Sequence, residues 1–173
     1  MYGPHIAVLY ASNAAQEFVK PMPHYFNPTK TLEDKLGFAA SNYEGVQAIP
    51  HIVQYLEGKN DAIAAHEAKL QTILLDFLTS RKGITVLGST STDSSVRVPT
   101  ISFVVEGQSS KQIVLEAEKI SNFGFRFGHF YSKRLCDEVL GLGPEGVVRV
   151  SMVHYNTEDE IKGLVEMFKK ILP

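Results

Sequence analysis

The stretch GVVRVSMVHYNTEDEI, residues 146–161, joins an apolar strand pattern directly to the start of a helix. Its first half, VVRVSMV, is rich in the β-branched residues that strands favour. In its second half Thr157 and Glu160 have the spacing of a capping box, in which each side chain bonds a backbone N–H of the other. The stretch therefore predicts a strand followed by a helix over 157–171, as in an α+β domain.

One charged residue, Arg149, interrupts this apolar strand between Val148 and Val150. A guanidinium among such neighbours needs an anion, because an unpaired buried charge is too costly to keep. Two partners satisfy this need: an internal Asp or Glu, or the carboxylate or phosphate of a ligand. The planar fork of arginine donors suits a bidentate carboxylate. The sequence predicts an anion partner for Arg149 and leaves both kinds open.

The residues from Gly83 onward alternate between strands and helices, with short Gly, Ser and Pro punctuation. The predicted strands are 84–88, 98–106, 123–128 and 147–153. The predicted helices are 109–121, about 131–140 and 157–171. This half is expected to form a compact α+β unit whose helices cover one face of a mostly antiparallel sheet.

The first part of the chain has a different pattern. HIAVLY, residues 5–10, predicts a buried strand, and a short helix is expected after Ser12. Asn42 is the expected N-cap of a further helix, which Pro50 should kink or restart. The longest helix is predicted over 60–82. Three prolines between these helices predict an extended surface loop: Pro21, Pro23 and Pro28.

Composition excludes several classes of protein. The 173 residues are 44% hydrophobic and carry 17 basic and 19 acidic side chains, for a net charge of −2. No Lys/Arg run tracks a phosphate backbone, so no nucleic-acid partner is expected. A signal-peptide pattern and an apolar run of roughly 20 residues are both missing, so no membrane insertion is expected. The single cysteine, Cys136, cannot form an internal disulfide, which favours a cytoplasmic location.

A second motif, FRFGHFYSKRLC at residues 125–136, turns from a strand into a helix at a glycine. Such turns often present side chains to a cleft, which makes His129 and Tyr131 candidates for ligand contacts. The alternative is structural, with both side chains capping the helix and filling a groove. No metal site is predicted, because the spacing of His129, Cys136 and His154 matches no standard zinc pattern.

Four segments, in this order and spacing, resemble the C-terminal part of class V aminotransferases of the cysteine-desulfurase-like branch. They are MYGPHIAVLY at 1–10, KLGFAASNYEGVQAI at 35–49, FRFGHFYSKRL at 125–135 and GVVRVSMVHYNTEDEI at 146–161. The resemblance covers essentially the whole chain. It implies an α/β to α+β fragment of the aspartate-aminotransferase-like fold of pyridoxal-phosphate (PLP) enzymes. Residues 1–58 would be a remnant of the large PLP-binding domain, and residues 59–173 the small domain.

The same resemblance implies where the cofactor is anchored. The turn Tyr2-Gly3-Pro4 closely follows the Schiff-base lysine in this family, so that lysine would stand immediately before Met1. No catalytic residue and no covalently held PLP are then expected in this chain. The family threonine that contacts the cofactor phosphate corresponds to Ala40. Its neighbours Ser41 and Asn42 are the remaining candidates for cofactor binding.

For the substrate, the resemblance implies three residues. Arg149 stands where the family binds the α-carboxylate of the amino acid, and His129 and Tyr131 stand in the active-site loop. Tyr131 occupies the position of the nucleophilic cysteine of group II desulfurases, and Cys136 lies five residues later. This puts desulfuration in doubt.

Two functions follow as expectations. The first is a C-terminal portion of a PLP-dependent enzyme acting on an amino acid, inactive alone because its lysine is absent. The second is a non-catalytic α+β binding or interaction module derived from that family. A homodimer or self-association is expected. In the parent enzyme, residues 6–10 and the helix that begins at Asn42 would pack on other strands and on a second subunit, and without these partners their apolar faces are uncovered.

Overall fold

The computed structural model describes residues 5–21, 25, 31–37 and 41–173. The chain divides into two compact units, Met1–Lys59 and Asn60–Pro173. Each is described by itself. None of the helices in the described residues combines the length and the apolar character that crossing a bilayer requires.

The first unit is helical where it is described. Its helices are α1 (Asn13–Phe18), α2 (Leu32–Leu36) and α3 (Tyr43–Leu56). The predicted short helix after Ser12 and the predicted N-cap of α3 at Asn42 are confirmed. The Ser12 hydroxyl accepts from the Ala15 amide at 3.2 Å, and the Asn42 carboxamide accepts from the Gly45 amide at 2.9 Å.

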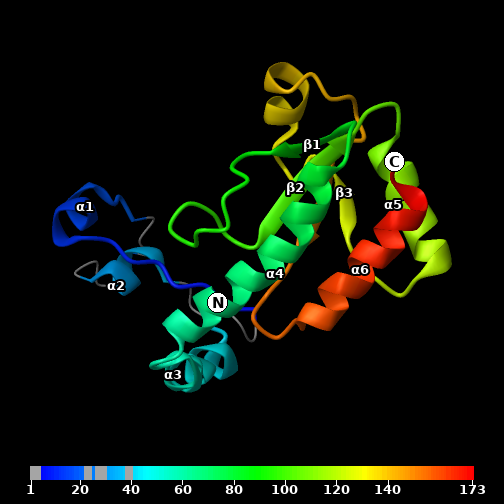
Figure 1. Ribbon diagram of the computed structural model, residues 1–173. Coiled ribbons are helices and arrows are strands. Elements are labelled where there is room, and N and C mark those ends of the chain that lie inside the picture. The colour runs from blue at the N-terminus through cyan, green and yellow to red at the C-terminus, as the bar shows by residue number, and fades with distance from the viewer. Residues whose placement is uncertain (1–4, 22–24, 26–30, 38–40) are drawn as a thin grey trace. The chain divides into compact units, whose positions relative to one another are not determined.

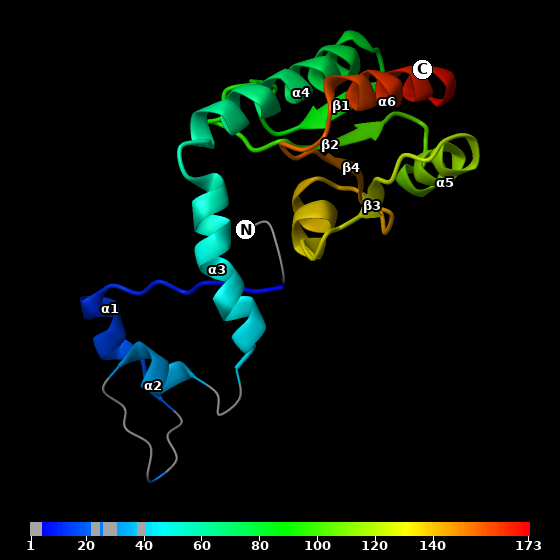
Figure 2. The ribbon, with the colours of Figure 1, turned by 90° about the horizontal axis from the view of Figure 1, so that it is seen from below.

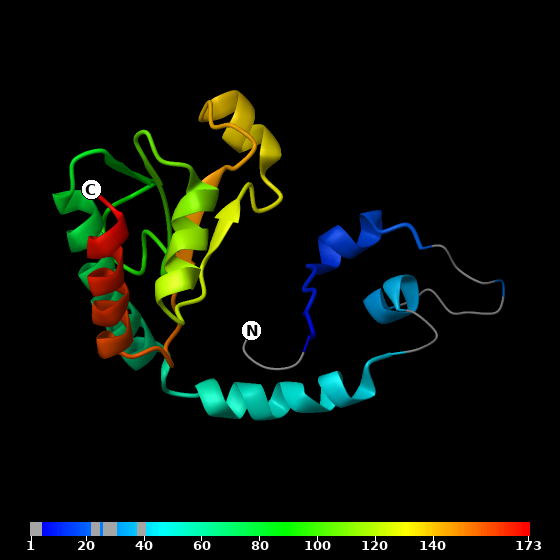
Figure 3. The ribbon, with the colours of Figure 1, turned by 90° about the vertical axis from the view of Figure 1, so that its right-hand side faces the viewer.

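Helix α3 contains Pro50 in its interior, and Figure 3 shows this helix as one continuous cyan ribbon. Of the two predicted effects of Pro50, the restart of the helix is therefore wrong, and the kink stays a prediction. Proline removes one backbone N–H donor and its ring crowds the carbonyl four residues earlier, yet the helix continues past it.

The segment 5–10 forms no strand, so that prediction is also wrong. A strand exists through the ladder bonds of a partner, and no strand among the described residues pairs with this segment. Its side chains are exposed rather than buried: Val8 by 63%, Leu9 by 68% and Tyr10 by 86%. The turn at Tyr2-Gly3-Pro4, two of the loop prolines and Ala40 lie outside the described residues.

The second unit is built on a four-stranded antiparallel sheet in the order β1-β2-β4-β3 (Figure 1). Its strands are β1 (Ile84–Leu87), β2 (Thr100–Val105), β3 (Arg126–Gly128) and β4 (Val147–Ser151). The predicted antiparallel sheet is confirmed. β3 is shorter than the predicted 123–128, because it is an edge strand that pairs with β4 over only three positions.

Three helices cover one face of this sheet: α4 (Asn60–Ser80), α5 (Ser110–Ile120) and α6 (Glu158–Ile171). Figure 2 shows α4 and α6 side by side over the strands. The capping box of α6 is present as predicted, with the Thr157 amide donating to the Glu160 carboxylate at 2.7 Å and the Glu160 amide donating to the Thr157 hydroxyl at 3.1 Å.

The core lies between these helices and the sheet. Alternate residues of β2 point into it, and Ile101 and Phe103 are completely buried. Phe168 of α6 is also completely buried at its centre. Its ring lies within aromatic contact distance of three others: Phe77 at 6.4 Å, Phe103 at 5.8 Å and Phe125 at 5.2 Å. Because one face of each strand is committed to this core, the other face is left to carry polar groups.

Candidate functional site

Arg149 lies on the face of the sheet that the helices leave uncovered. On β4 its neighbours Val148 and Val150 are buried in the core, and alternation turns Arg149 the other way. The register places it opposite Ser102 on β2 and Arg126 on β3. The strand is therefore apolar towards the core and basic on its open face.

A cavity of about 390 Å³ opens beside Arg149. It lies wholly within the second unit, and its lining includes His129, Phe130 and Cys136. The structure thus brings together Arg149 and the predicted loop residue His129, which are 20 positions apart in the sequence. This volume is within the range of small-molecule sites, roughly 300–1,000 Å³.

No acidic side chain of the described residues neutralises Arg149. Within the part of the chain that the structure describes, it takes part in no ion pair, and its Nε is buried without a hydrogen-bond partner. Its guanidinium carbon lies 3.8 Å from the centre of the Phe130 ring. The ring stabilises the charge from one face and leaves the donors at the guanidinium edge available. Of the two partners open from the sequence, the described contacts favour a ligand anion.

Phe130 reaches this position through an unusual turn. Phe130 and Tyr131 both have positive φ, 49° and 65°, and the Ser132 amide donates to the His129 carbonyl at 2.8 Å. Positive φ at both central residues is the pattern of a type I′ turn, which Asn and Gly normally occupy. Two aromatic residues in this conformation cost on the order of 1–3 kcal/mol each. This turn conformation places the Phe130 ring against Arg149.

Gly146 fixes the base of this turn. It has φ 59°, and a Cβ at this position would overlap the backbone carbonyl of Gly128. Only glycine allows these two backbone segments to approach so closely where β3 ends and β4 begins. This contact sets the distance between the turn that carries Phe130 and the strand that carries Arg149.

The helix predicted over about 131–140 is present over 133–139, and its segment Leu135–Val139 is π-helical. The left-handed residues before it delay the start of the helix, and π turns of this kind are frequent at functional sites. Cys136, at 4% exposure, lines the cavity from this segment.

The two predicted loop residues, His129 and Tyr131, differ in their positions: His129 lines the cavity and Tyr131 does not. The His129 Nε2 is buried, makes no hydrogen bond, and lies 3.9 Å from the Asp137 carboxylate. Tyr131 is fully exposed and is not among the residues that line the cavity. Phe130, which the sequence did not single out, makes the contact with Arg149. No spacing rule links an aromatic residue to an arginine on a strand 19 positions later.

Ser41 and Asn42 lie in the first unit, at the start of α3. Asn42 is committed to capping that helix. The Ser41 hydroxyl is exposed and makes no hydrogen bond with the described residues, while its carbonyl accepts from the Tyr43 amide at 3.0 Å. The described residues contain no group of three His, Cys, Asp or Glu side chains that could hold a metal ion.

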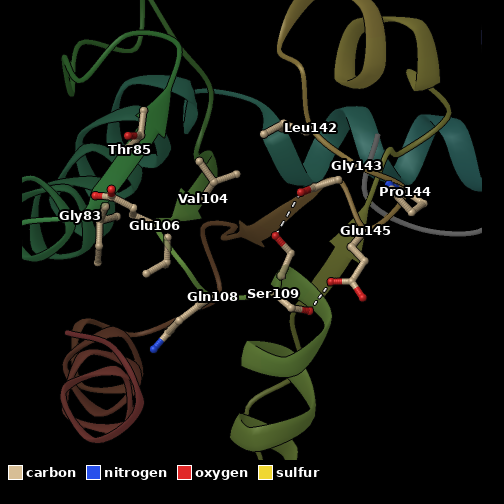
Figure 4. Close-up of a pocket in the computed structure, with 14 residues that line it drawn as sticks. Gly83, Thr85, Val104, Glu106, Gln108, Ser109, Leu142, Gly143, Pro144 and Glu145 are labelled. Atoms are coloured by element: carbon tan, nitrogen blue, oxygen red, sulfur yellow. Dashed lines mark hydrogen bonds between the residues drawn. The ribbon is translucent and has the colours of Figure 1, made fainter.

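A larger cavity of about 760 Å³ occupies another part of the second unit (Figure 4). The Ser109 hydroxyl donates to the Glu145 carboxylate, and the Ser110 hydroxyl donates to the Gly146 carbonyl at 3.0 Å. Glu106 adds a second carboxylate to its lining, and no Lys or Arg of the described residues lines it. The two carboxylates in this lining disfavour a carboxylate ligand. The hydrogen bonds of Ser109 and Ser110 anchor the loop that leads into β4.

Comparison with known proteins identifies the family of this chain. A model of the family described as "Aminotransferase class-V" matches residues 1–164. The chain therefore belongs to the class V aminotransferase family, which includes the cysteine-desulfurase-like proteins, and the predicted family is confirmed.

Two curated relatives match almost the whole chain. It is 51% identical to the aminotransferase-like protein FGM3 of Gibberella zeae, over 99% of this chain and 44% of that protein. It is 33% identical to the cysteine desulfurase-like protein ustD of Aspergillus flavus, over 99% of this chain and 40% of that protein. The chain thus spans less than half the length of these relatives.

Solved structures confirm the predicted fold. A cysteine desulfurase from Thermococcus onnurineus has a TM-score of 0.69 at 19% identity, covering 80% of this chain and 33% of that one. The cysteine desulfurase CsdA from Escherichia coli has a TM-score of 0.65 at 22% identity, covering 81% and 34%. The sheet and its helices fit a fragment of the PLP-enzyme fold.

The stacking of Phe130 on Arg149 generates a prediction. Phe130→Leu removes the aromatic face, so the dissociation constant of acetate, measured by NMR titration of the chain, should rise by about threefold or more. Phe130→Tyr keeps the ring and should bind acetate as the unchanged chain does. If the leucine and tyrosine variants bind acetate equally well, the ring does not support the guanidinium.

Proposed function

We propose that this chain is the C-terminal part of a PLP-dependent enzyme acting on an amino acid, and that Arg149 binds the substrate α-carboxylate. The observation that carries the proposal is the buried Nε of Arg149, which has no partner among the described residues. A carboxylate in the plane of the guanidinium supplies the missing acceptor and can accept two parallel hydrogen bonds. Family membership supports the amino-acid substrate.

His129 and Tyr131 complete the proposed substrate site. His129 has a buried, unbonded Nε2 at the cavity and can donate to or accept from a group of the bound substrate. Tyr131 is fully exposed and does not line the cavity. Its proposed contact is therefore with a part of the substrate that lies outside the cavity. Cys136 is buried, which disfavours it as a replacement for a nucleophilic loop cysteine.

We assign the first unit to the large PLP-binding domain and the second to the small domain. When bound, PLP supplies the electron sink that amino-acid chemistry requires. Ser41 and Asn42 are proposed to lie at its phosphate, at the amino end of a 14-residue helix. The described contacts favour Ser41 as the donor, because its hydroxyl makes no hydrogen bond with the described residues, whereas the Asn42 carboxamide oxygen already caps α3.

The chain alone is proposed to be inactive. Every lysine of the second unit is exposed, and none lines the cavity beside Arg149. An amine placed at the cofactor aldehyde is needed to hold PLP covalently. The described residues of this unit do not provide one. A cavity with Arg149 but without a lysine in its described lining also fits a second function, that of a module that binds a carboxylate without turnover.

Exposed apolar side chains in the first unit support a further proposal, that the chain self-associates as a homodimer. They include Val8, Leu9, Tyr10 and Phe18, each exposed by 63% or more. Light scattering should show a species larger than a monomer. A clean monomer at high concentration that binds no hydrophobic dye argues against this proposal.

The single free thiol, Cys136, supports a cytoplasmic location.

The role of Arg149 is tested by matched variants on opposing strands. Arg149→Gln removes the charge at the cavity and should raise the dissociation constant of acetate by about tenfold or more. Arg126→Gln removes a charge on β3 whose partner is the exposed Glu118 at 3.5 Å, and should leave acetate binding within about twofold. Equal losses in the two variants would remove Arg149 from the substrate site.

Borohydride reduction in the presence of PLP, followed by peptide mapping, tests whether the chain alone is inactive. Exposed lysines should give scattered, substoichiometric pyridoxyl labels. A single stoichiometric pyridoxyl-lysine, with a spectral change on adding an amino acid, contradicts the proposed inactivity. It would also exclude the module that binds a carboxylate without turnover.

A further inference from the structure

The cavity beside Arg149 has a largely aliphatic wall. Leu135 and Leu140 contribute to it from the π-helical segment and its end, Leu87 from the end of β1, and Val147 from β4. Among the described residues that line it, Arg149 is the only Lys or Arg, and no Asp or Glu is present. A ligand here meets one fixed positive charge and several alkyl groups.

The strand register gives this wall a direction. Leu87 pairs with Ser102, and Ser102 pairs with Arg149, so these three residues form a row across one face of the sheet. Since neighbouring strands lie about 4.8 Å apart, Leu87 is two strands, or roughly 10 Å, from Arg149. A molecule whose carboxylate meets the guanidinium can therefore extend across Ser102 towards Leu87.

We infer that this cavity is the subsite for the substrate side chain, and that it selects an aliphatic side chain over a charged one. The inference rests on the proposed role of Arg149. A second carboxylate would lose its hydration against an alkyl wall and find no second Lys or Arg in the described lining. An aliphatic side chain gains from leaving water there. The substrate class is thus a carboxylate with an aliphatic body.

Three carboxylates test this selectivity: acetate, glutarate, and isocaproate, which carries the isobutyl group of leucine. Their dissociation constants are measured by NMR titration of the complete chain. Isocaproate should bind at least about tenfold more tightly than acetate, because each buried methylene is worth roughly fourfold in affinity. Glutarate should bind no more tightly than acetate. Glutarate binding as tightly as isocaproate, or isocaproate binding no better than acetate, would overturn the inference.

A matched pair of variants locates the subsite. Leu140 lines the cavity and is 37% exposed, whereas its neighbour Val139 is 73% exposed and is not among the lining residues. Leu140→Ser should remove most of the preference for isocaproate and leave acetate binding unchanged, and Val139→Ser should preserve that preference. Equal effects of the two substitutions contradict the inference. If circular dichroism shows that the Leu140→Ser variant is unfolded, Leu135→Ser replaces it in the test. Leu135 also lines the cavity and is 49% exposed.

The series also separates this inference from the proposed function. If Arg149→Gln weakens all three carboxylates but the unchanged chain shows no preference for isocaproate, the aliphatic subsite is wrong and the role of Arg149 stands. If Arg149→Gln changes none of them, the proposed carboxylate site itself is wrong.

Discussion

The guanidinium of Arg149, stacked on Phe130 and unpaired at its edge, is the interaction on which the site depends. An arginine can be held in a cavity by an acid or by an aromatic face. An acid would use the same donors that a ligand needs, whereas the ring leaves them free. The aromatic face therefore stabilises the charge while keeping the edge of the guanidinium available for an anion.

The fold provides this arrangement by dividing the sheet into two faces. One face is committed to the core around Phe168, so the chain can place polar groups only on the other. The close approach of Gly146 to Gly128 then brings the turn after β3 to the strand that carries Arg149. The left-handed conformation of Phe130 is the local cost of this geometry.

Sequence patterns predicted much of the second unit because its signals are local. The capping box at Thr157 and the β-branched strands act within a few residues, and the structure has both. The segment 5–10 was wrongly predicted as a strand, because its apolar pattern specifies burial but no partner strand is among the described residues. The need of Arg149 for an anion was predictable from the cost of an unpaired charge. Its contact with Phe130 was not, because it depends on a turn conformation that the residues Phe-Tyr do not favour.

The central claim is that the Arg149 edge is free in the unliganded chain and is taken up by a carboxylate. The most direct measurement is the ¹⁵N-resolved side-chain Nε–H resonance of Arg149, recorded without and with acetate, with Arg126 as the internal reference. The account predicts an Arg149 signal without a strong acceptor that shifts downfield on adding acetate, while the Arg126 signal stays in place. An Arg149 signal already shifted downfield before acetate is added, or one that does not respond to it, would contradict the account.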